Sequence, residues 1–146
     1  DWTITGVLTL QSGMPVAVAQ ATNNNAFAGF GTQRPNVTGD PRLPADERSV
    51  NRWFDTSVFS TAPAFTLGNA SRNPVRGPGS RNLDLAVIGR VPVTGGTNLE
   101  LRLEAFNVTN TPALGAPNGT FGSAAVGTIT SARDPRVLQL AVKVLF

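Results

Sequence analysis

Charged side chains alternate with leucines along the segment Asn98–Val108 (NLELRLEAFNV), at Glu100, Arg102 and Glu104. Residues two apart on a strand point to the same side. Two carboxylates on one side could form the acid and base of a glycosidase, but the arginine between them indicates mutual neutralisation instead. Asp84 and Arg90 belong to a neighbouring segment, and opposite charges on adjacent strands stabilise each other by about 0.2–1 kcal/mol. We therefore expect a structural charge network rather than a catalytic pair.

The chain contains no histidine and no cysteine. This excludes disulfide bonds, imidazole or thiolate metal sites, and every mechanism that needs a histidine base or a cysteine nucleophile. Carboxylates could still bind Ca²⁺, but four of them lack the spacing of a calcium-binding loop: Asp40, Asp46, Glu47 and Asp55. We therefore expect neither enzymatic activity nor a metal or other cofactor.

Aromatic side chains gather in the long segment 16–80, where sustained periodicity is missing: Trp53, Phe54, Phe59 and Phe65. Two roles are open to them. Trp53, Phe54 and Phe59 could stack on a ligand as loop contacts. Alternatively, these rings fix the loop onto itself or lie at a membrane interface, and this second role is the one we favour.

The composition limits the class of protein. The 146 residues suffice for one domain, and only 14% of them are charged, compared with about 25% in soluble domains. The net charge is +3 and the arginines are scattered, so we expect no nucleic-acid partner. The longest apolar run is too short for a membrane-spanning helix. Because the chain begins at Asp1 without a leader sequence, we expect a piece of a longer protein.

Period-two alternation predicts strands of about ten residues. The expected strands lie near residues 1–11, 81–92, 98–108, 125–130 and 136–146. The Gly-Gly connection Thr94–Thr97 is typical of a tight hairpin turn. Between the first two strands, residues 16–80 form a long irregular loop, in which only Ala45–Phe54 has a helix-like pattern.

Long strands with a short turn on one side and long loops on the other are typical of transmembrane β-barrels. We therefore predict an all-β fold of about four or five antiparallel transmembrane strands, an incomplete barrel with a long irregular extracellular loop. Leucine and valine rows would face the lipid, and the charged row would line the lumen: Asp84, Arg90, Glu100, Arg102 and Glu104. The alternative is a soluble, secreted β-sandwich domain that binds carbohydrate or protein.

Six stretches, in order along nearly the whole chain, resemble the C-terminal end of TonB-dependent outer-membrane receptors. They are Leu10–Pro15 (LQSGMP), Asn51–Phe59 (NRWFDTSVF), Arg76–Leu85 (RGPGSRNLDL), Leu101–Asn110 (LRLEAFNVTN), Phe121–Thr130 (FGSAAVGTIT) and Pro135–Phe146. The nearest type is the Oar-like group, whose members carry an N-terminal carboxypeptidase-regulatory-like domain. Phe146, an aromatic residue after a period-two strand, resembles the assembly signal of bacterial outer-membrane barrels.

The resemblance implies a barrel of about 22 strands with a plug in its lumen, located in the bacterial outer membrane. Such a receptor takes up substrates with energy from the inner membrane. This chain has neither plug nor energy-coupling segment, so it would supply barrel closure, the assembly signal and an extracellular loop. The implied partners are the lipid bilayer, the rest of the barrel and its plug, the barrel-assembly machinery, and an inner-membrane energy-coupling protein that binds the missing N-terminal part.

Overall fold

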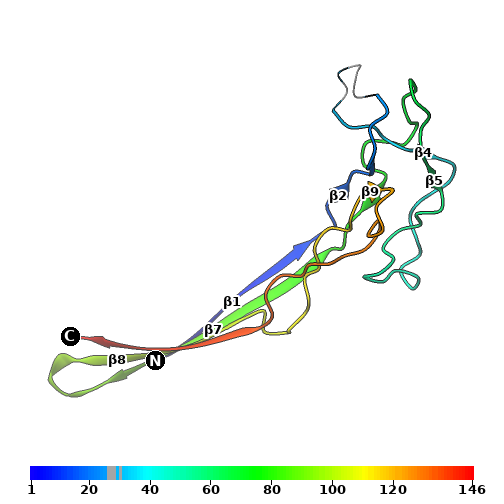
Figure 1. The fold of residues 1–146 in the computed structure, drawn as a ribbon. Helices are drawn as coiled ribbons and strands as arrows, with labels where there is room; N and C mark the ends of the chain where they lie inside the picture. Colours follow the sequence, from blue (N-terminus) through cyan, green and yellow to red (C-terminus); the bar gives the residue numbers. More distant parts are fainter. Residues whose placement is uncertain (26–28, 30) are drawn as a thin grey trace. The chain divides into compact units, whose positions relative to one another are not determined.

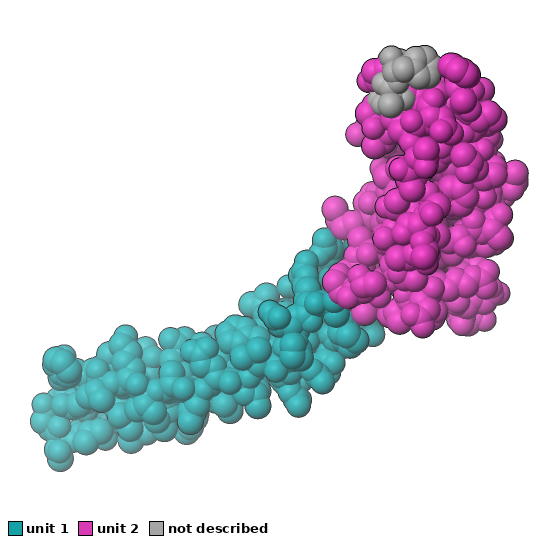
Figure 2. Space-filling model, viewed as in Figure 1, with its two compact units in different colours: residues 1–12, 79–113, 132–146 teal, residues 13–78, 114–131 magenta. Residues whose placement is uncertain are grey.

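The computed structural model describes residues 1–25, 29 and 31–146. The chain divides into two compact units (Figure 2). The sheet unit, drawn in teal, comprises residues 1–12, 79–113 and 132–146. The loop unit, drawn in magenta, comprises residues 13–78 and 114–131. Each unit therefore combines segments that are far apart in the sequence.

The sheet unit is a single antiparallel sheet of four long strands, with the order β1-β7-β8-β10 (Figure 1). These strands are β1 (Trp2–Gln11), β7 (Ser80–Pro92), β8 (Asn98–Phe106) and β10 (Val137–Leu145). Each coincides with a segment of alternating residues, because one face of such a strand is apolar and the other polar. β1 and β10 are the two edges, so the sheet is open and does not close into a barrel.

The connections of the sheet are strongly unequal. Between β7 and β8 the chain turns within Thr94–Gly96, where Gly95 and Gly96 have φ values of 76° and 80° that favour glycine. The amide of Val93 donates to the carbonyl of Thr97 at 2.8 Å and closes this turn. The other two connections, β1 to β7 and β8 to β10, are long and leave from the opposite end of the strands.

The loop unit contains three short strand pairs that alternation could not reveal. β2 (Pro15–Val16) pairs with β6 (Val75–Arg76), and β4 (Asn36–Val37) pairs with β5 (Phe59–Ser60), both antiparallel. β3 (Ala19–Gln20) runs parallel to β9 (Thr120–Phe121), which comes from the second long connection. Apart from these pairs residues 16–78 are mostly irregular, yet they pack with residues 114–131 in one unit. Residues 26–28 and 30 of this loop lie outside the described part of the chain.

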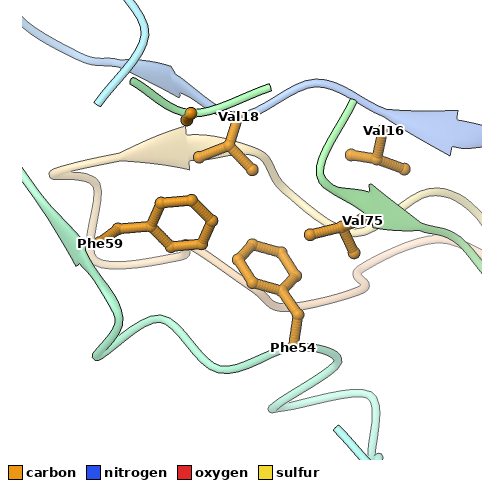
Figure 3. Packing of buried hydrophobic residues seen from close by; sticks show 6 residues of the cluster. Val16, Val18, Phe54, Phe59 and Val75 are labelled. Carbon is orange, nitrogen blue, oxygen red and sulfur yellow. The ribbon is translucent and has the colours of Figure 1, made fainter. Parts of the chain in front are cut away.

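The core of the molecule lies in the loop unit (Figure 3). Its buried members are Val16, Val18, Phe54, Phe59, Ala70 and Val75. The rings of Phe54 and Phe59 meet edge to face, with 6.1 Å between centroids, and Phe121 lies 6.1 Å from Phe59. Both long connections therefore contribute to a single apolar cluster, and burial of these side chains is what holds the unit together.

Two sequence predictions are wrong. Residues 125–130 form no strand, although the structure describes all of them. Local turns use their amides, because Val126 N donates to Ser123 O and Thr128 N to Ala125 O, and Gly127 has a φ of 78°. Ala45–Phe54 forms no helix either. The Glu47 amide donates to the Pro44 carbonyl in a turn, and a β-bridge between Ser49 and Arg52 follows. These hydrogen bonds replace those of a helix.

Candidate functional site

The two faces of the sheet unit differ sharply in chemistry. The register places Leu103 between Val87 and Leu140, and Ile4 opposite Val87, in one apolar row across all four strands. Neighbouring rows on this face continue the pattern with these residues: Trp2, Leu8, Leu10, Leu83, Leu85, Val91, Leu99, Leu101, Leu138, Val142 and Val144. Most of these side chains are exposed, with Leu140 at 75% and Ile4 at 74%. An apolar face of this extent requires a non-aqueous neighbour.

Glycines on the apolar face make room for large neighbours. A Cβ atom at Gly89 would lie 2.7 Å from the six-membered ring of Trp2, the residue directly opposite. A Cβ atom at Gly6 would lie 2.7 Å from Cδ2 of Leu85. The Trp2 ring therefore lies close to the backbone of β7 at Gly89, an approach that only glycine permits.

The opposite face carries the charges that the sequence places on alternate positions. Arg90 Nε lies 2.9 Å from Glu100 Oε2, and Arg102 Nη2 lies 3.3 Å from Glu104 Oε1. Lys143 is directly opposite Glu100 on β10, so this carboxylate has a cation on each neighbouring strand. Glu100 is only 6% exposed. The ion pair with Arg90 and the positive charge of Lys143 on the other side offset the cost of desolvating it, and an acid–base pair with free carboxylates is not formed.

Asp84 lies apart from these pairs, near the end of the strands where the long connections leave. Its Oδ1 accepts hydrogen bonds from Asn82 Nδ2 and from the Asn107 amide, both at 2.8 Å. Asn107 has a φ of 51°, which ends β8 and turns its amide toward Asp84. Asp84 thus fixes the end of the hairpin, a role that its residue type alone did not reveal.

A concave cavity of about 430 Å³ lies beside Asp84 in the sheet unit. Its walls include Asn82, Asp84, Phe106, Asn107, Arg133 and Asp134. The cavity combines both signs of charge with amide groups, as a site for small polar molecules would.

The aromatic side chains of the loop unit differ in how deeply they are buried. Phe54 is fully buried and Phe59 is 5% exposed, so neither ring is available to a ligand and both pack in the core. Trp53 is half-buried; its Nε1 donates to Arg76 O at 2.8 Å, and the Arg48 guanidinium lies 5.8 Å from its ring centre. In the structure these three rings pack within the loop unit and hold its segments together.

A cluster of buried amides, missed in the sequence, also fixes the loop unit. Gln20 Nε2 donates to Gln33 Oε1 at 3.1 Å, and the amide of Ala62 donates to Gln20 Oε1. Gln33 Nε2 and Asn25 Nδ2 both donate to the carbonyl of Thr66. Buried glutamines and asparagines leave no periodic signal, because their partners are backbone groups of segments far away in the sequence.

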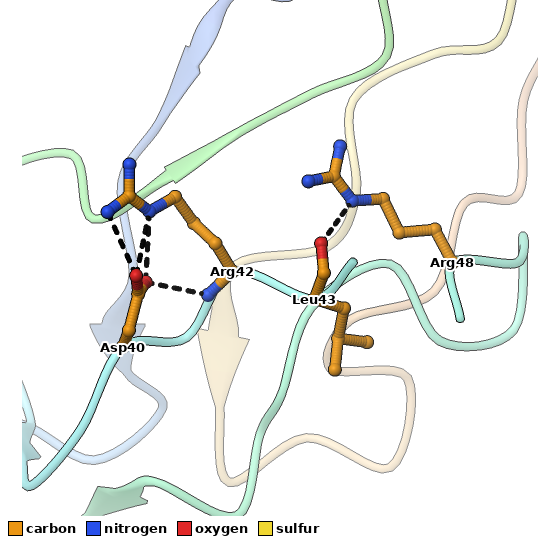
Figure 4. Close-up of polar contacts among 4 residues, drawn as sticks. All are labelled: Asp40, Arg42, Leu43 and Arg48. Carbon is orange, nitrogen blue, oxygen red and sulfur yellow. Dashed lines mark hydrogen bonds and ion pairs between the residues drawn. The ribbon is translucent and has the colours of Figure 1, made fainter. Parts of the chain in front are cut away.

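The acidic residues of the loop unit serve turns rather than a metal site. Asp40 accepts from Arg42 Nε at 2.9 Å, and these hydrogen bonds lower the pKa of Asp40 and raise that of Arg42 (Figure 4). In the same view, Arg48 Nε donates to Leu43 O at 2.8 Å. Asp55 accepts from the hydroxyl and the amide of Ser57, which lowers the pKa of Asp55. Within the described residues, no group of three or more metal-ligating side chains comes together.

Phe146, the predicted assembly signal, follows β10 and is fully exposed. Its ring makes no contribution to the packing of the sheet unit, so any role it has must depend on another molecule.

No helix in the described part of the chain is long and apolar enough to cross a membrane.

Comparison with known proteins identifies the family. The family model described as "Outer membrane beta barrel domain" matches residues 1–139. No curated protein and no solved structure matches significantly. The match covers nearly the whole chain, including β1, β7, β8 and the start of β10, and it accounts for a sheet with one exposed apolar face. The predicted all-β fold with antiparallel transmembrane strands is thereby confirmed. The chain belongs to the outer membrane beta barrel domain family, and its location is the bacterial outer membrane.

Proposed function

We propose that this chain is the C-terminal portion of a TonB-dependent receptor barrel of the Oar-like type, and that it is not an enzyme. The observation that supports this most directly is the sheet unit. One face is apolar and exposed, the other carries paired charges, and long connections leave from only one end. The alternative of a soluble β-sandwich would need a second sheet over the apolar face, and the outer-membrane family assignment argues against it.

Both edges of the sheet unit imply additional strands. β1 and β10 each have one unpaired side, and unsatisfied backbone groups in lipid cost several kcal/mol each. In the proposed receptor, β1 pairs with a preceding strand and β10 closes the barrel against the first. The remainder of the barrel and its plug are therefore the first partners of this chain.

The faces of the sheet then acquire distinct roles. The apolar rows contact the bilayer, and the charged row lines the lumen: Asp84, Arg90, Glu100, Arg102 and Glu104. Four of these charges form two ion pairs, Arg90 with Glu100 and Arg102 with Glu104, which suits a hydrated lumen wall. The loop unit is extracellular, because the long connections of such barrels lie outside the cell.

The decisive experiment addresses energy coupling in the full-length protein. Purified in detergent, the protein is expected to capture the periplasmic domain of the inner-membrane energy-coupling protein. In planar bilayers it is expected to show no steady conductance, since a plug fills the lumen. A porin of the same membrane, which captures nothing and conducts, is the control. An open channel that does not bind the coupling domain would identify a passive pore and overturn the proposal.

A further inference from the structure

Charges of alternating sign form one row across all four strands of the sheet unit, on its charged face. Arg90 of β7 is directly opposite Glu100 of β8, and Glu100 is directly opposite Lys143 of β10. On the other side of β7, the Arg90 amide donates to the Asp1 carbonyl at 2.8 Å and the Asp1 amino group donates to the Arg90 carbonyl at 3.0 Å. Asp1 is therefore opposite Arg90. From edge to edge, this cross-strand charge row reads negative, positive, negative, positive: Asp1, Arg90, Glu100, Lys143.

The two middle members of the cross-strand charge row form an ion pair, whereas Lys143 at its end does not. Arg90 Nε lies 2.9 Å from Glu100 Oε2. Among the described residues, Lys143 has no ion pair within 4.0 Å, and its side chain is exposed. Because the arginine already holds the Glu100 carboxylate, the ammonium group of Lys143 has N–H donors available for an acceptor on its other side.

The other side of Lys143 is the unpaired edge of the sheet. β10 pairs with β8 alone, and in a closed barrel a further strand satisfies the free backbone groups of β10. The residue of that strand directly opposite Lys143 would have its Cβ atom about 4.5–5.5 Å from the Cβ atom of Lys143. At this separation a like charge is destabilising and an opposite charge is stabilising. The edge of β10 therefore discriminates between strands by the charge at one position.

The charge at this position also bears on the register of β10. A slip by two residues keeps every side chain on its own face, so alternation of apolar and polar residues does not exclude such a slip. Between β8 and β10, it would move Lys143 from Glu100 to either Arg102 or Asn98. The first slip brings like charges together, and the second removes the opposite charge. The position of Lys143 thus selects one register among those that the apolar rows allow.

We propose that the free edge of β10 binds a strand that carries an aspartate or glutamate directly opposite Lys143, and that this ion pair fixes the register in which the barrel closes. The partner is the first strand of the barrel, with its carboxylate on the lumen side. The inference rests on closure of the barrel by β10, which is part of the proposed function, and not on energy coupling. A passive pore closed by the same strand would contain the same ion pair, so the two proposals can fail separately.

Carbodiimide cross-linking of the full-length protein, folded in lipid vesicles, tests this ion pair. The reagent joins an amine directly to a carboxylate and takes up the water that is lost, so only groups in contact react. Lys143 is the only lysine of this chain, and mass spectrometry of the digested product identifies the residue linked to it. We expect an aspartate or glutamate of the first barrel strand. Linkage to Glu100 alone, linkage to a carboxylate outside that strand, or no linkage of Lys143 in the folded protein would overturn the proposal.

Three variants make the result specific. E100Q removes the carboxylate on the β8 side and should leave the link to the first strand unchanged. Q139K/K143Q keeps the net charge but moves the lysine two rows along the same face of β10, opposite Glu104, and should abolish that link. An equally abundant link from position 139 to the same carboxylate would show that the position of the lysine does not set the register, and the proposal would be wrong. K143Q should raise the unfolding equilibrium constant in vesicles by no more than about fivefold, so the barrel still folds without this lysine.

Discussion

At the scale of single residues, Phe54 shows how a loop without regular secondary structure can be well packed. Its ring is fully buried and is in edge-to-face contact with Phe59. The carbonyl of Pro41 accepts a hydrogen bond from Asp55, and Trp53 donates to Gly127 O, so the backbone on both sides of Phe54 is fixed. The ring therefore occupies a prepared site, and its removal leaves a cavity that neighbours cannot easily fill.

We expect Phe54→Ala to destabilise the loop unit by about 3–5 kcal/mol, the usual cost of deleting a buried aromatic side chain. Amide hydrogen exchange of the full-length protein measures this locally. Amides of residues 16–18 and 70–75 should exchange about 150- to 5000-fold faster than in the wild type, since each 1.36 kcal/mol is a factor of ten, while those of β7 and β8 should be unaffected.

Phe65→Ala is the matched control, because the Phe65 side chain is 81% exposed. It deletes the same atoms in the same unit, and it should change exchange rates less than about twofold. Equal effects of the two substitutions would contradict the assignment of Phe54 to the core.

At the scale of secondary-structure elements, the row through Leu103 is the centre of the apolar face. Rows with Val91 and Leu101 precede it toward the tight turn, and rows with Leu85 and Leu83 follow it toward the long connections. Arginine on the lipid face costs about 2–4 kcal/mol at the bilayer midplane. Leu103→Arg in the full-length protein should therefore reduce the free energy of unfolding in lipid vesicles by this amount, as measured by chemical denaturation.

The charged face provides the control for this substitution. Gln139→Arg introduces the same side chain on β10, directly opposite Glu104. We expect a change below about 1 kcal/mol, since the new cation can pair with that carboxylate. A larger loss from Gln139→Arg than from Leu103→Arg would mean that the two faces have been assigned the wrong way round.

The long strands could be predicted from the sequence, whereas the structure of the loops could not. β1, β7, β8 and β10 alternate over nine residues or more, a pattern that depends only on which face each residue occupies. In the loop unit the strands have two residues each, too short for any period. What organises it are long-range contacts, such as the pairing of β3 with β9 and the bond from Gln20 to Gln33.

The candidate site, too, could be predicted only in part from the sequence. Alternation placed Glu100, Arg102 and Glu104 on one face, and opposite charge accounts for the ion pairs of Glu100 with Arg90 on β7 and of Arg102 with Glu104 on the same strand. The burial of Glu100 and the hydrogen bonds of Asp84 were not predictable, because they depend on strand register and on the left-handed conformation of Asn107.

At the scale of the whole molecule, the two units are stabilised in different environments. The loop unit has a buried core and can be stable in water. The sheet unit exposes most of its large apolar side chains, and burial of these in lipid is what stabilises it. The strands can therefore complete their fold only after the chain has reached a membrane. Assembly thus requires a step of delivery to the membrane.

Phe146 is the residue through which we expect this step to act. Its side chain is fully exposed and follows β10, an edge strand, so it contributes nothing to the packing of the sheet. Deleting Phe146 from the full-length protein should therefore leave the stability of protein refolded in vesicles unchanged. In cells, immunoblots of outer-membrane fractions should show a severalfold lower level, because recognition by the assembly machinery is weakened. Phe146→Tyr keeps an aromatic ring and should restore the level. Phe146 is not the assembly signal if the deletion variant reaches the outer membrane at the wild-type level. The same holds if the deletion lowers the stability of the protein in vesicles, because instability would then explain a lower level in cells.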